Sequence, residues 1–213
     1  MKKGILFDLD GTLWDATRQM LPAWQRVMER HSIHEVTLTH AVMQSLMGKT
    51  VPQIADILLP DAASAEGIAV INECCKEELI DLSRNGGTLY PDVVVTLNQL
   101  HKRYELFIVS NCQDGYIQTF LDYYRLRDLI ADFESHGATG LTKGENIRLV
   151  VTRNHLDKVF YLGDTQSDAD AAHFAGIPFV HASYGFGNVP NEERKIAAFR
   201  EVADIAEQLL CGQ

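Results

Sequence analysis

The chain has 213 residues, 46% hydrophobic and 23% charged, with a formal net charge of −10 and four cysteines. This balance is typical of globular proteins, and the length allows one domain with a sizeable insertion or two small domains. The acidic charge and the lack of a Lys/Arg run argue against nucleic acid as a partner, and no run of about 18 apolar residues could span a membrane.

The acidic charge also bears on small ligands. A large negative field disfavours anionic substrates unless a metal ion or a placed lysine reverses the sign locally. Any phosphate site in this chain must therefore include its own cation. The cysteines form no Cys-x-x-Cys pair, which indicates reduced thiols and a cytoplasmic protein.

The first predicted element is a buried strand from Gly4 to Asp8. Its apolar run is much shorter than the core of a signal peptide and precedes no small-residue cleavage site, so we expect no signal peptide here. The strand leads directly into Asp8-Leu9-Asp10-Gly11-Thr12, where the glycine permits a tight turn.

Residues from about Asp15 to Arg84 show only helical patterns. The clearest helix has apolar side chains at spacings of 3, 4, 4 and 3: Ile68, Ile71, Cys75, Leu79 and Leu82. The sequence Arg84-Asn85-Gly86-Gly87 then predicts a flexible joint. We therefore predict an all-helical cap, residues 15–84, inserted after the first strand of a catalytic core that comprises residues 1–14 and 85–213.

Strands and helices alternate in the rest of the chain. Short apolar runs that end in a polar residue predict strands at 105–110, 159–164 and 178–181, with a weaker candidate at 132–136. Helical patterns separate these runs, beginning with one from Pro91 to His101. This alternation predicts an α/β fold with a doubly wound parallel sheet and a Rossmann-like core.

Sites in a doubly wound sheet form at the carboxyl ends of the strands. Those ends, and the turns just after them, carry six polar side chains in this chain: Asp8, Asp10, Ser110, Asn111, Asp164 and Asp168. Four carboxylates that converge repel one another unless a cation lies among them. Oxygen ligands without histidine or cysteine favour a hard ion, so the sequence predicts Mg²⁺ as the cofactor.

Asp8 and Asp10 are placed to serve two separate chemical roles. One carboxylate can attack phosphorus and form an aspartyl phosphate. The other can give a proton to the leaving oxygen and later take one from water. The alternative for this segment alone is a purely structural role, as a strand that ends in a turn rich in Asp and Gly.

Four motifs follow one another in the chain. They are Leu6-Phe7-Asp8-Leu9-Asp10-Gly11-Thr12, Ser110-Asn111 after an apolar strand, Lys143 before a helix, and Gly163-Asp164-Thr165-Gln166-Ser167-Asp168. In this order they resemble the signatures of the haloacid dehalogenase superfamily, in its phosphatase branch and specifically its phosphoglycolate-phosphatase-like group with a helical cap. The resemblance covers the whole chain, and four ordered motifs are far more specific than any one of them.

The resemblance implies a role for each motif residue. Asp8 would be the nucleophile and a metal ligand, and Asp10 the general acid/base with its backbone carbonyl on the metal. Asp164 would be a metal ligand, and Asp168 would support the metal or its waters. The transferring phosphoryl oxygens would be held by three groups: Ser110, the Asn111 amide and Lys143.

Two lysines leave alternatives open. In many relatives proline follows the third-motif lysine, in the pattern Lys-Pro-x-Pro, whereas this chain has Lys143-Gly144-Glu145-Asn146. The resemblance therefore does not give the geometry of the loop around Lys143. Lys49 lies between two predicted cap helices, where it is either a substrate contact or a solvated loop lysine.

The function predicted from these observations is a magnesium-dependent phosphatase that hydrolyses a small phosphorylated metabolite through an aspartyl phosphate. Phosphoglycolate is the first single substrate to consider, by analogy with the family. The alternatives are a phosphomutase or phosphotransferase acting on a sugar phosphate, and a non-catalytic binding protein on the same fold. The expected partner is a small phosphate ester rather than nucleic acid or membrane, and the sequence leaves the oligomeric state open.

Overall fold

A six-stranded parallel sheet forms the centre of the protein, as seen in a computed structural model that describes residues 1–62 and 64–212. Its strand order is β5-β4-β1-β6-β7-β8, and every neighbouring pair is parallel. The strands are β1 (Lys3–Phe7), β4 (Glu105–Ser110), β5 (Asp132–Ser135), β6 (Lys158–Gly163), β7 (Phe179–Ala182) and β8 (Lys195–Ile196). β1 therefore lies in the middle of the sheet, between β4 and β6.

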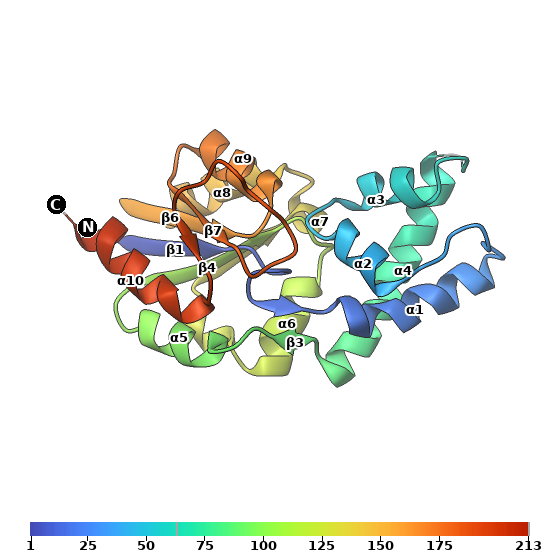
Figure 1. Ribbon diagram of the computed structural model, residues 1–213, viewed down its shortest axis with the longest axis horizontal. Coiled ribbons are helices and arrows are strands. Elements are labelled where there is room, and N and C mark those ends of the chain that lie inside the picture. The colour runs from blue at the N-terminus through green and yellow to red at the C-terminus, as the bar shows by residue number, and fades with distance from the viewer. Residues whose placement is uncertain (63, 213) are drawn as a thin grey trace.

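Helices cover both faces of this sheet (Figure 1). One face carries α8 (Lys143–Arg153) and α9 (Gln166–Ala175), and the other carries α5 (Val93–Leu100) and α10 (Val202–Ala206). Side chains alternate between the faces along a strand. Leu6 of β1 accordingly packs in the cluster beneath α8 and α9, while Ile5 and Phe7 pack in the opposite cluster. This two-sided burial explains the continuous apolar runs of the strands.

Shorter helices complete this part of the chain. They are α6 (Tyr116–Tyr124), α7 (His136–Thr139), the 3₁₀ turns η1 (Arg127–Leu129) and η2 (Phe199–Glu201), and the last turn η3 (Glu207–Cys211). The predicted α/β fold class with a parallel sheet is confirmed by this architecture. None of the helices in the described part of the chain combines the length and the apolar character needed to cross a bilayer.

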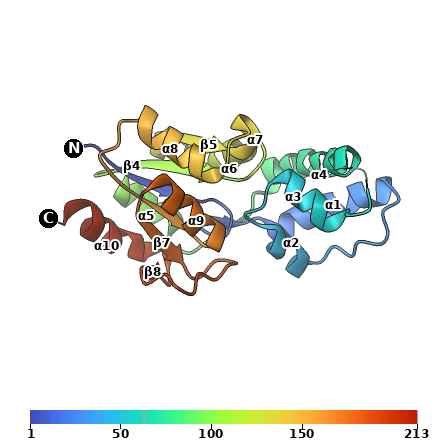
Figure 2. The same ribbon diagram turned by 90° about the horizontal axis from the view of Figure 1, so that it is seen from above.

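The first four helices of the described chain form what we call the helical segment, residues 17–85. They are α1 (Thr17–Arg30), α2 (His40–Leu46), α3 (Val51–Leu58) and α4 (Ser64–Asn85). Two views show them together at one end of the molecule, away from both termini (Figures 1 and 2). Thr50 caps the start of α3, where its backbone N–H donates to Gln53 Oε1 at 2.9 Å.

The two connections between the helical segment and the sheet lie side by side. β2 (Trp14–Asp15) precedes the segment, β3 (Thr88–Leu89) follows it, and the two pair in an antiparallel ribbon. Neither short strand is indicated by the sequence pattern. A division of the chain at residues 15 and 84 remains a prediction about domains.

The predicted flexible joint is wrong in its details. Arg84 and Asn85 form the last turn of α4, so only the two glycines lie outside the helix. Gly86 has φ +65, and a Cβ there would lie 2.2 Å from Tyr123 Cε1. A Cβ on Gly87 would lie 2.7 Å from Trp14 Cε3. The glycines serve a close packed contact rather than a loose linker.

Other boundaries differ from expectation by small amounts. The helix expected from Pro91 begins at Val93, because Asp92 adopts a left-handed conformation with φ 65. The weaker strand candidate at 132–136 is present as β5, and β8 at the far edge of the sheet was not expected. A strand of two residues is too short to leave a hydrophobic pattern in the sequence.

Candidate active site

The candidate site lies at the carboxyl ends of the three central strands. Asp8 follows β1, Ser110 is the last residue of β4, and Asp164 follows β6. β1 pairs with both of the other strands, so these three residues are brought to one edge of the sheet. The helical segment lies beyond that edge (Figure 1).

Three buried carboxylates form a cluster at this edge. Asp8, Asp164 and Asp168 each offer an oxygen, and these atoms all lie within 4.8 Å of one another. Burial raises the pKa of Asp8 to about 6, and the neighbouring Asp168 adds to the rise. The carboxyl of Asp10 lies outside this cluster, so three of the four predicted carboxylates converge on it.

Lys143 provides the positive charge of the cluster. Its Nζ lies 2.9 Å from Asp8 Oδ1 and 2.6 Å from Asp168 Oδ1, and all three side chains are buried. Burial alone would lower the pKa of this lysine, but the two carboxylates outweigh that effect and raise it. Lys143 is therefore a cation in the folded protein.

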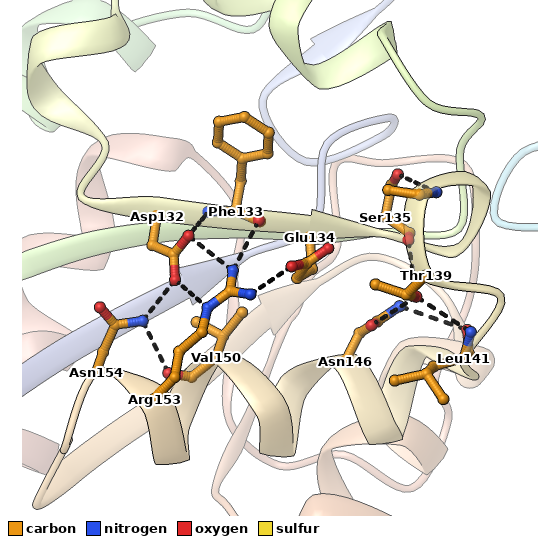
Figure 3. Close-up of polar contacts among 11 residues, drawn as sticks. Asp132, Phe133, Glu134, Ser135, Thr139, Leu141, Asn146, Val150, Arg153 and Asn154 are labelled. Carbon is orange, nitrogen blue, oxygen red and sulfur yellow. Dashed lines mark hydrogen bonds and ion pairs between the residues drawn. The ribbon is translucent and has the colours of Figure 1, made fainter.

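The turn before Lys143 is held by hydrogen bonds instead of prolines. Lys143 is the first residue of α8, and Glu145 Oε2 accepts from the backbone N–H of Thr142 at 2.8 Å. Asn146 is fully buried, and its Oδ1 accepts from Thr139 Oγ1 at 2.9 Å while its Nδ2 donates to Leu141 O at 3.4 Å (Figure 3). Asn146 thus fastens the turn from the position where many relatives have the second proline.

The other end of α8 is bound to the edge strand β5 by an ion pair and hydrogen bonds. Arg153 donates from Nε to Asp132 Oδ2 at 2.6 Å and from Nη2 to Asp132 Oδ1 at 2.7 Å, a bidentate pair (Figure 3). Asn154 Nδ2 also donates to Asp132 Oδ2, at 2.6 Å. With both ends of the helix tied to neighbouring elements, the position of Lys143 at its first turn is well defined.

Asp168 is saturated by protein donors. Its Oδ2 accepts from the Thr165 hydroxyl at 2.7 Å and from the backbone N–H groups of Thr165 at 2.9 Å and Asp164 at 3.2 Å. Its Oδ1 accepts from Lys143. Asp168 therefore shapes the turn that carries Asp164 as well as orienting the lysine.

Asp164 is enclosed by glycines and backbone donors. A Cβ on Gly11 would lie 2.2 Å from Asp164 Oδ2, so only glycine allows this approach of the first motif to the fourth. The backbone N–H of Phe186 donates to the same Oδ2 at 2.7 Å. Asp164 Oδ1, in contrast, is buried with no hydrogen-bond partner in the described part of the chain. A buried carboxylate oxygen without a donor is suited to bind a cation.

Asp10 has a different environment from the cluster. Its Oδ1 accepts from the hydroxyl of Tyr116, on α6, at 2.8 Å. Burial, and then the charge of Asp8, raise the pKa of Asp10 well above its usual range. This shift favours the protonated carboxyl, which is the state required of a general acid.

A small cavity opens beside Asp10, at the junction with the helical segment. Ser110, Asn111 and Lys49 line it together with Asp10. Asn111 Nδ2 donates to the backbone carbonyl of Gly48 at 2.8 Å, which joins the loop after β4 to the turn between α2 and α3. The structure thus brings the predicted residues into two adjoining places, the carboxylate cluster and this cavity.

Several residues of the site were not assigned by sequence reasoning. Tyr116 on Asp10, the backbone of Gly185–Gly187 around Asp164, and Asn146 behind Lys143 are the clearest cases. The run Tyr184-Gly185-Phe186-Gly187 carries a signal, since closely spaced glycines mark a close backbone approach. A Cβ on Gly185 would lie 2.3 Å from Asp164 Cβ. Tyr116 carries no comparable local signal.

Comparisons with known proteins agree with this geometry. The family described as haloacid dehalogenase-like hydrolase matches residues 5–182. Among curated proteins, the phosphoglycolate phosphatase of Aliivibrio fischeri is 28% identical over 204 residues, which cover 87% of this chain and 86% of that protein. The phosphoglycolate phosphatase of Rhodobacter capsulatus is 26% identical over 205 residues, with 89% and 88% covered.

Solved structures share the fold. A haloacid dehalogenase-like family protein of Streptococcus pneumoniae superposes with a TM-score of 0.79 at 18% identity, covering 96% of this chain and 98% of its own. The CbbY protein of Rhodobacter sphaeroides, solved in complex with phosphate, gives a TM-score of 0.80 at 15% identity, with 95% and 96% covered. The predicted family and the predicted class of enzyme, a phosphatase, are confirmed. The chain belongs to the haloacid dehalogenase-like hydrolase family.

Proposed function

We propose that this protein is a magnesium-dependent phosphatase that hydrolyses a small phosphate monoester through a phosphoryl group on Asp8. The observation that carries the proposal is the placement of Asp8. Its carboxylate lies in a buried cluster with Asp164 and Asp168, while Lys143 Nζ is only 2.9 Å from its Oδ1. A nucleophile for phosphate needs such nearby cations, because the incoming dianion is repelled by carboxylates.

The residues present fit a magnesium ion. Asp8 and Asp164 would hold it through oxygen, and the unpartnered Asp164 Oδ1 is the atom best explained by a cation. Asp10 would add its backbone carbonyl, as the family resemblance implies. When bound, the ion would supply positive charge that offsets the carboxylates and draws in the phosphate.

The chain's own residues then account for two displacements at phosphorus. A carboxylate oxygen of Asp8 forms a bond to phosphorus as the bond to the ester oxygen breaks, and Asp10 gives its proton to the departing alkoxide. A water molecule next attacks the same phosphorus, Asp10 takes its proton, and the bond to Asp8 breaks to release phosphate. Ser110, the Asn111 amide and Lys143 would hold the phosphoryl oxygens in both steps.

The helical segment is proposed to be the lid over this site, with residues 15–84 as a cap on a core of residues 1–14 and 85–213. Its support is the cavity shared by Lys49 and Asp10 and the hydrogen bond from Asn111 to Gly48. A closed lid keeps water away while the leaving group is present, and an open one admits it afterwards.

The substrate is proposed to be a small phosphate ester, and the names of the curated relatives make phosphoglycolate the first compound to test. A phosphomutase or phosphotransferase and a non-catalytic binding protein remain the competing functions on this fold. All four motifs are present in the sequence, which favours catalysis over binding alone.

The deciding experiment measures turnover by the wild type and by a variant of the proposed nucleophile. Purified protein is incubated with Mg²⁺ and phosphoglycolate or a generic aryl phosphate, and released phosphate is measured. We expect turnover by the wild type and a loss of at least about 10³-fold in Asp8→Asn, because an amide cannot form the acyl phosphate. An Asp56→Asn variant, on the exposed side of α3, controls for a general effect of losing one carboxylate.

The outcomes separate the candidates. Phosphate release that requires Asp8 supports the phosphatase. Transfer of the phosphoryl group to a second position on a sugar phosphate without net release would identify a mutase. Binding of phosphate esters without any turnover would leave a binding protein, and Asp8→Asn activity within tenfold of the wild type would remove Asp8 as the nucleophile.

A further inference from the structure

A buried carboxyl outside the four motifs lines the cavity beside Asp10. Glu78 lies on α4 and is 1% exposed. Its Oε2 accepts from Trp24 Nε1 on α1, and its Oε1 accepts from Gln113 Nε2 in the loop after β4. Glu78 lines the same cavity as Asp10 and Ser110. It is the glutamate that the helical segment places opposite the proposed general acid.

No basic side chain in the described part of the chain lies within ion-pair distance of Glu78. The ion pairs of α4 are made by acidic neighbours that are only partly buried, such as Glu73 and Glu77 with Arg30. Burial raises the pKa of Glu78 to about 8, although the hydrogen bonds from Trp24 and Gln113 lower it. A buried carboxyl without a cation costs stability, so its position in a cavity wall calls for a functional reason.

The cavity is narrow and has a mixed lining. Its free space measures about 40 Å³, which is room for about three water molecules. Apolar walls are provided by side chains such as Met20, Met47 and Ile54. Asp10 and Glu78 add two buried carboxyls, while Lys49, the cation in the lining, is partly exposed. A leaving group that fits here is short, with a carbon stem and one polar end.

We propose that Glu78 selects the leaving group of the substrate, so that this phosphatase prefers a small hydroxyl-bearing alcohol phosphate over a carboxylate-bearing one such as phosphoglycolate. The proposal rests on the proposed function and names the substrate class within it. The free lone pairs of the Glu78 carboxyl can accept from a hydroxyl or, when the carboxyl is protonated, its O–H can donate to one. A hydroxyl end therefore matches Glu78 in either protonation state.

A carboxylate end is a poorer match. It is repelled by ionised Glu78 in a space with little water, where like charges interact strongly. It can pair with Glu78 only when Glu78 carries a proton. Lys49 offers less compensation, because its charge is partly hydrated at the edge of the cavity. Once Glu78 is ionised, above a pH of about 8, the balance of these charges favours the neutral alcohol.

Two matched substrates test this inference. 2-Hydroxyethyl phosphate and 2-phosphoglycolate have the same two-carbon stem and differ in the end group, hydroxyl against carboxylate. We compare their kcat/KM values with wild type, with Glu78→Gln, and with Glu66→Gln, an exposed position on the same helix. The Glu78→Gln side chain keeps its shape and can still accept from Trp24, while the amide of Gln113 can turn to offer its oxygen.

At a pH above about 8, where Glu78 is ionised, we expect the wild type and Glu66→Gln to prefer 2-hydroxyethyl phosphate by at least tenfold in kcat/KM. Glu78→Gln should reduce that preference to within about threefold, chiefly by raising kcat/KM for phosphoglycolate. A wild type that prefers phosphoglycolate, or a preference unchanged in Glu78→Gln, overturns the inference. If Glu78→Gln fails to fold, Trp24→Phe removes one donor to the carboxyl and should alter the same ratio; an unaltered ratio counts against the proposal. Absence of turnover with every ester would instead overturn the proposed function.

Discussion

The ammonium group of Lys143 lies 2.6 Å from Asp168 Oδ1, and the two side chains are 3% and 0% exposed. The same ammonium reaches Asp8 Oδ1 at 2.9 Å. Asp168 is also bound by three donors from residues 164 and 165. The lysine is thus paired with a carboxylate whose orientation is fixed by these donors. The position of Lys143 relative to Asp8 therefore follows from that of Asp168.

Lys143→Met should remove both stability and activity. The change leaves two buried carboxylates without their cation, a loss of about 3–5 kcal/mol in the free energy of unfolding for the metal-free protein. It should also lower kcat/KM by at least about 100-fold, since the proposed phosphate site loses its fixed positive charge. Denaturant unfolding and phosphate release measure the two effects. Lys102→Met, at an exposed position, is the control, and equal behaviour of the two variants would refute the role of Lys143.

Magnesium should stabilise the folded protein through Asp164. A ligand that binds only the folded state raises its stability, so saturating Mg²⁺ should raise the Tm of the wild type by about 5 °C or more. Asp164→Asn should show little or no increase, because it alters the carboxylate with the unpartnered Oδ1. Thermal unfolding with and without chelator provides the measurement. The same rise in both proteins would place the ion elsewhere.

Asn146→Ala should loosen the turn that carries Lys143. The substitution removes the bonds to the Thr139 hydroxyl and the Leu141 carbonyl, which keep partners in Ser135 and His136, and the loss of two hydrogen bonds costs about 1–3 kcal/mol in total. We expect that loss in the free energy of unfolding, together with a fall of about tenfold in kcat/KM as the lysine shifts. Asn98→Ala removes an exposed side chain that bonds only within its own helix and is the matched control. Unchanged kcat/KM in Asn146→Ala would show that the turn is held by other contacts.

Glu78 should make stability depend on pH. Its pKa is raised from 4.5 to about 8 on folding, so the folded protein holds this proton more tightly than the unfolded chain does. The stabilising contribution is complete below pH 4.5 and disappears as the pH rises through about 8. Between pH 5 and pH 8 the free energy of unfolding of the wild type should fall by at least about 1 kcal/mol more than that of Glu78→Gln. Denaturant unfolding in chelator across this range measures it; parallel curves would mean that Glu78 is ionised in the folded protein.

The sequence predicts the strand-end residues well, and for a physical reason. Asp8, Ser110 and Asp164 follow apolar runs, and parallel strands necessarily bring their carboxyl ends to one edge. Glu78 and Tyr116 are different, because each reaches the site through the packing of a helix against another element. Their side chains sit in ordinary amphipathic patterns, and a pattern identifies a buried face without saying which group it meets.

Lys143 shows an intermediate case. Its motif is one residue, and the sequence after it departs from the proline pattern of many relatives. Thr142 and Glu145 form the hydrogen bonds that begin α8, an arrangement typical of a Thr-x-x-Glu sequence. The bond from Thr139 to Asn146 was not predictable, since it depends on how α7 and α8 meet.

The pairing of β2 with β3 has a consequence for how such proteins can diversify. Asp15 and Thr88 are register partners, so their Cα atoms are about 5 Å apart. The chain leaves the sheet and returns to it at nearly the same point, so the segment between these residues is covalently connected to the rest at one place, and its other contacts, such as that of Asn111 with Gly48, are non-covalent. A segment attached in this way can be lengthened, shortened or exchanged for an unrelated one while β1 and β4 keep their register. The range of substrates can then change through replacement of this segment, without any substitution in the cluster of Asp8, Asp164 and Asp168.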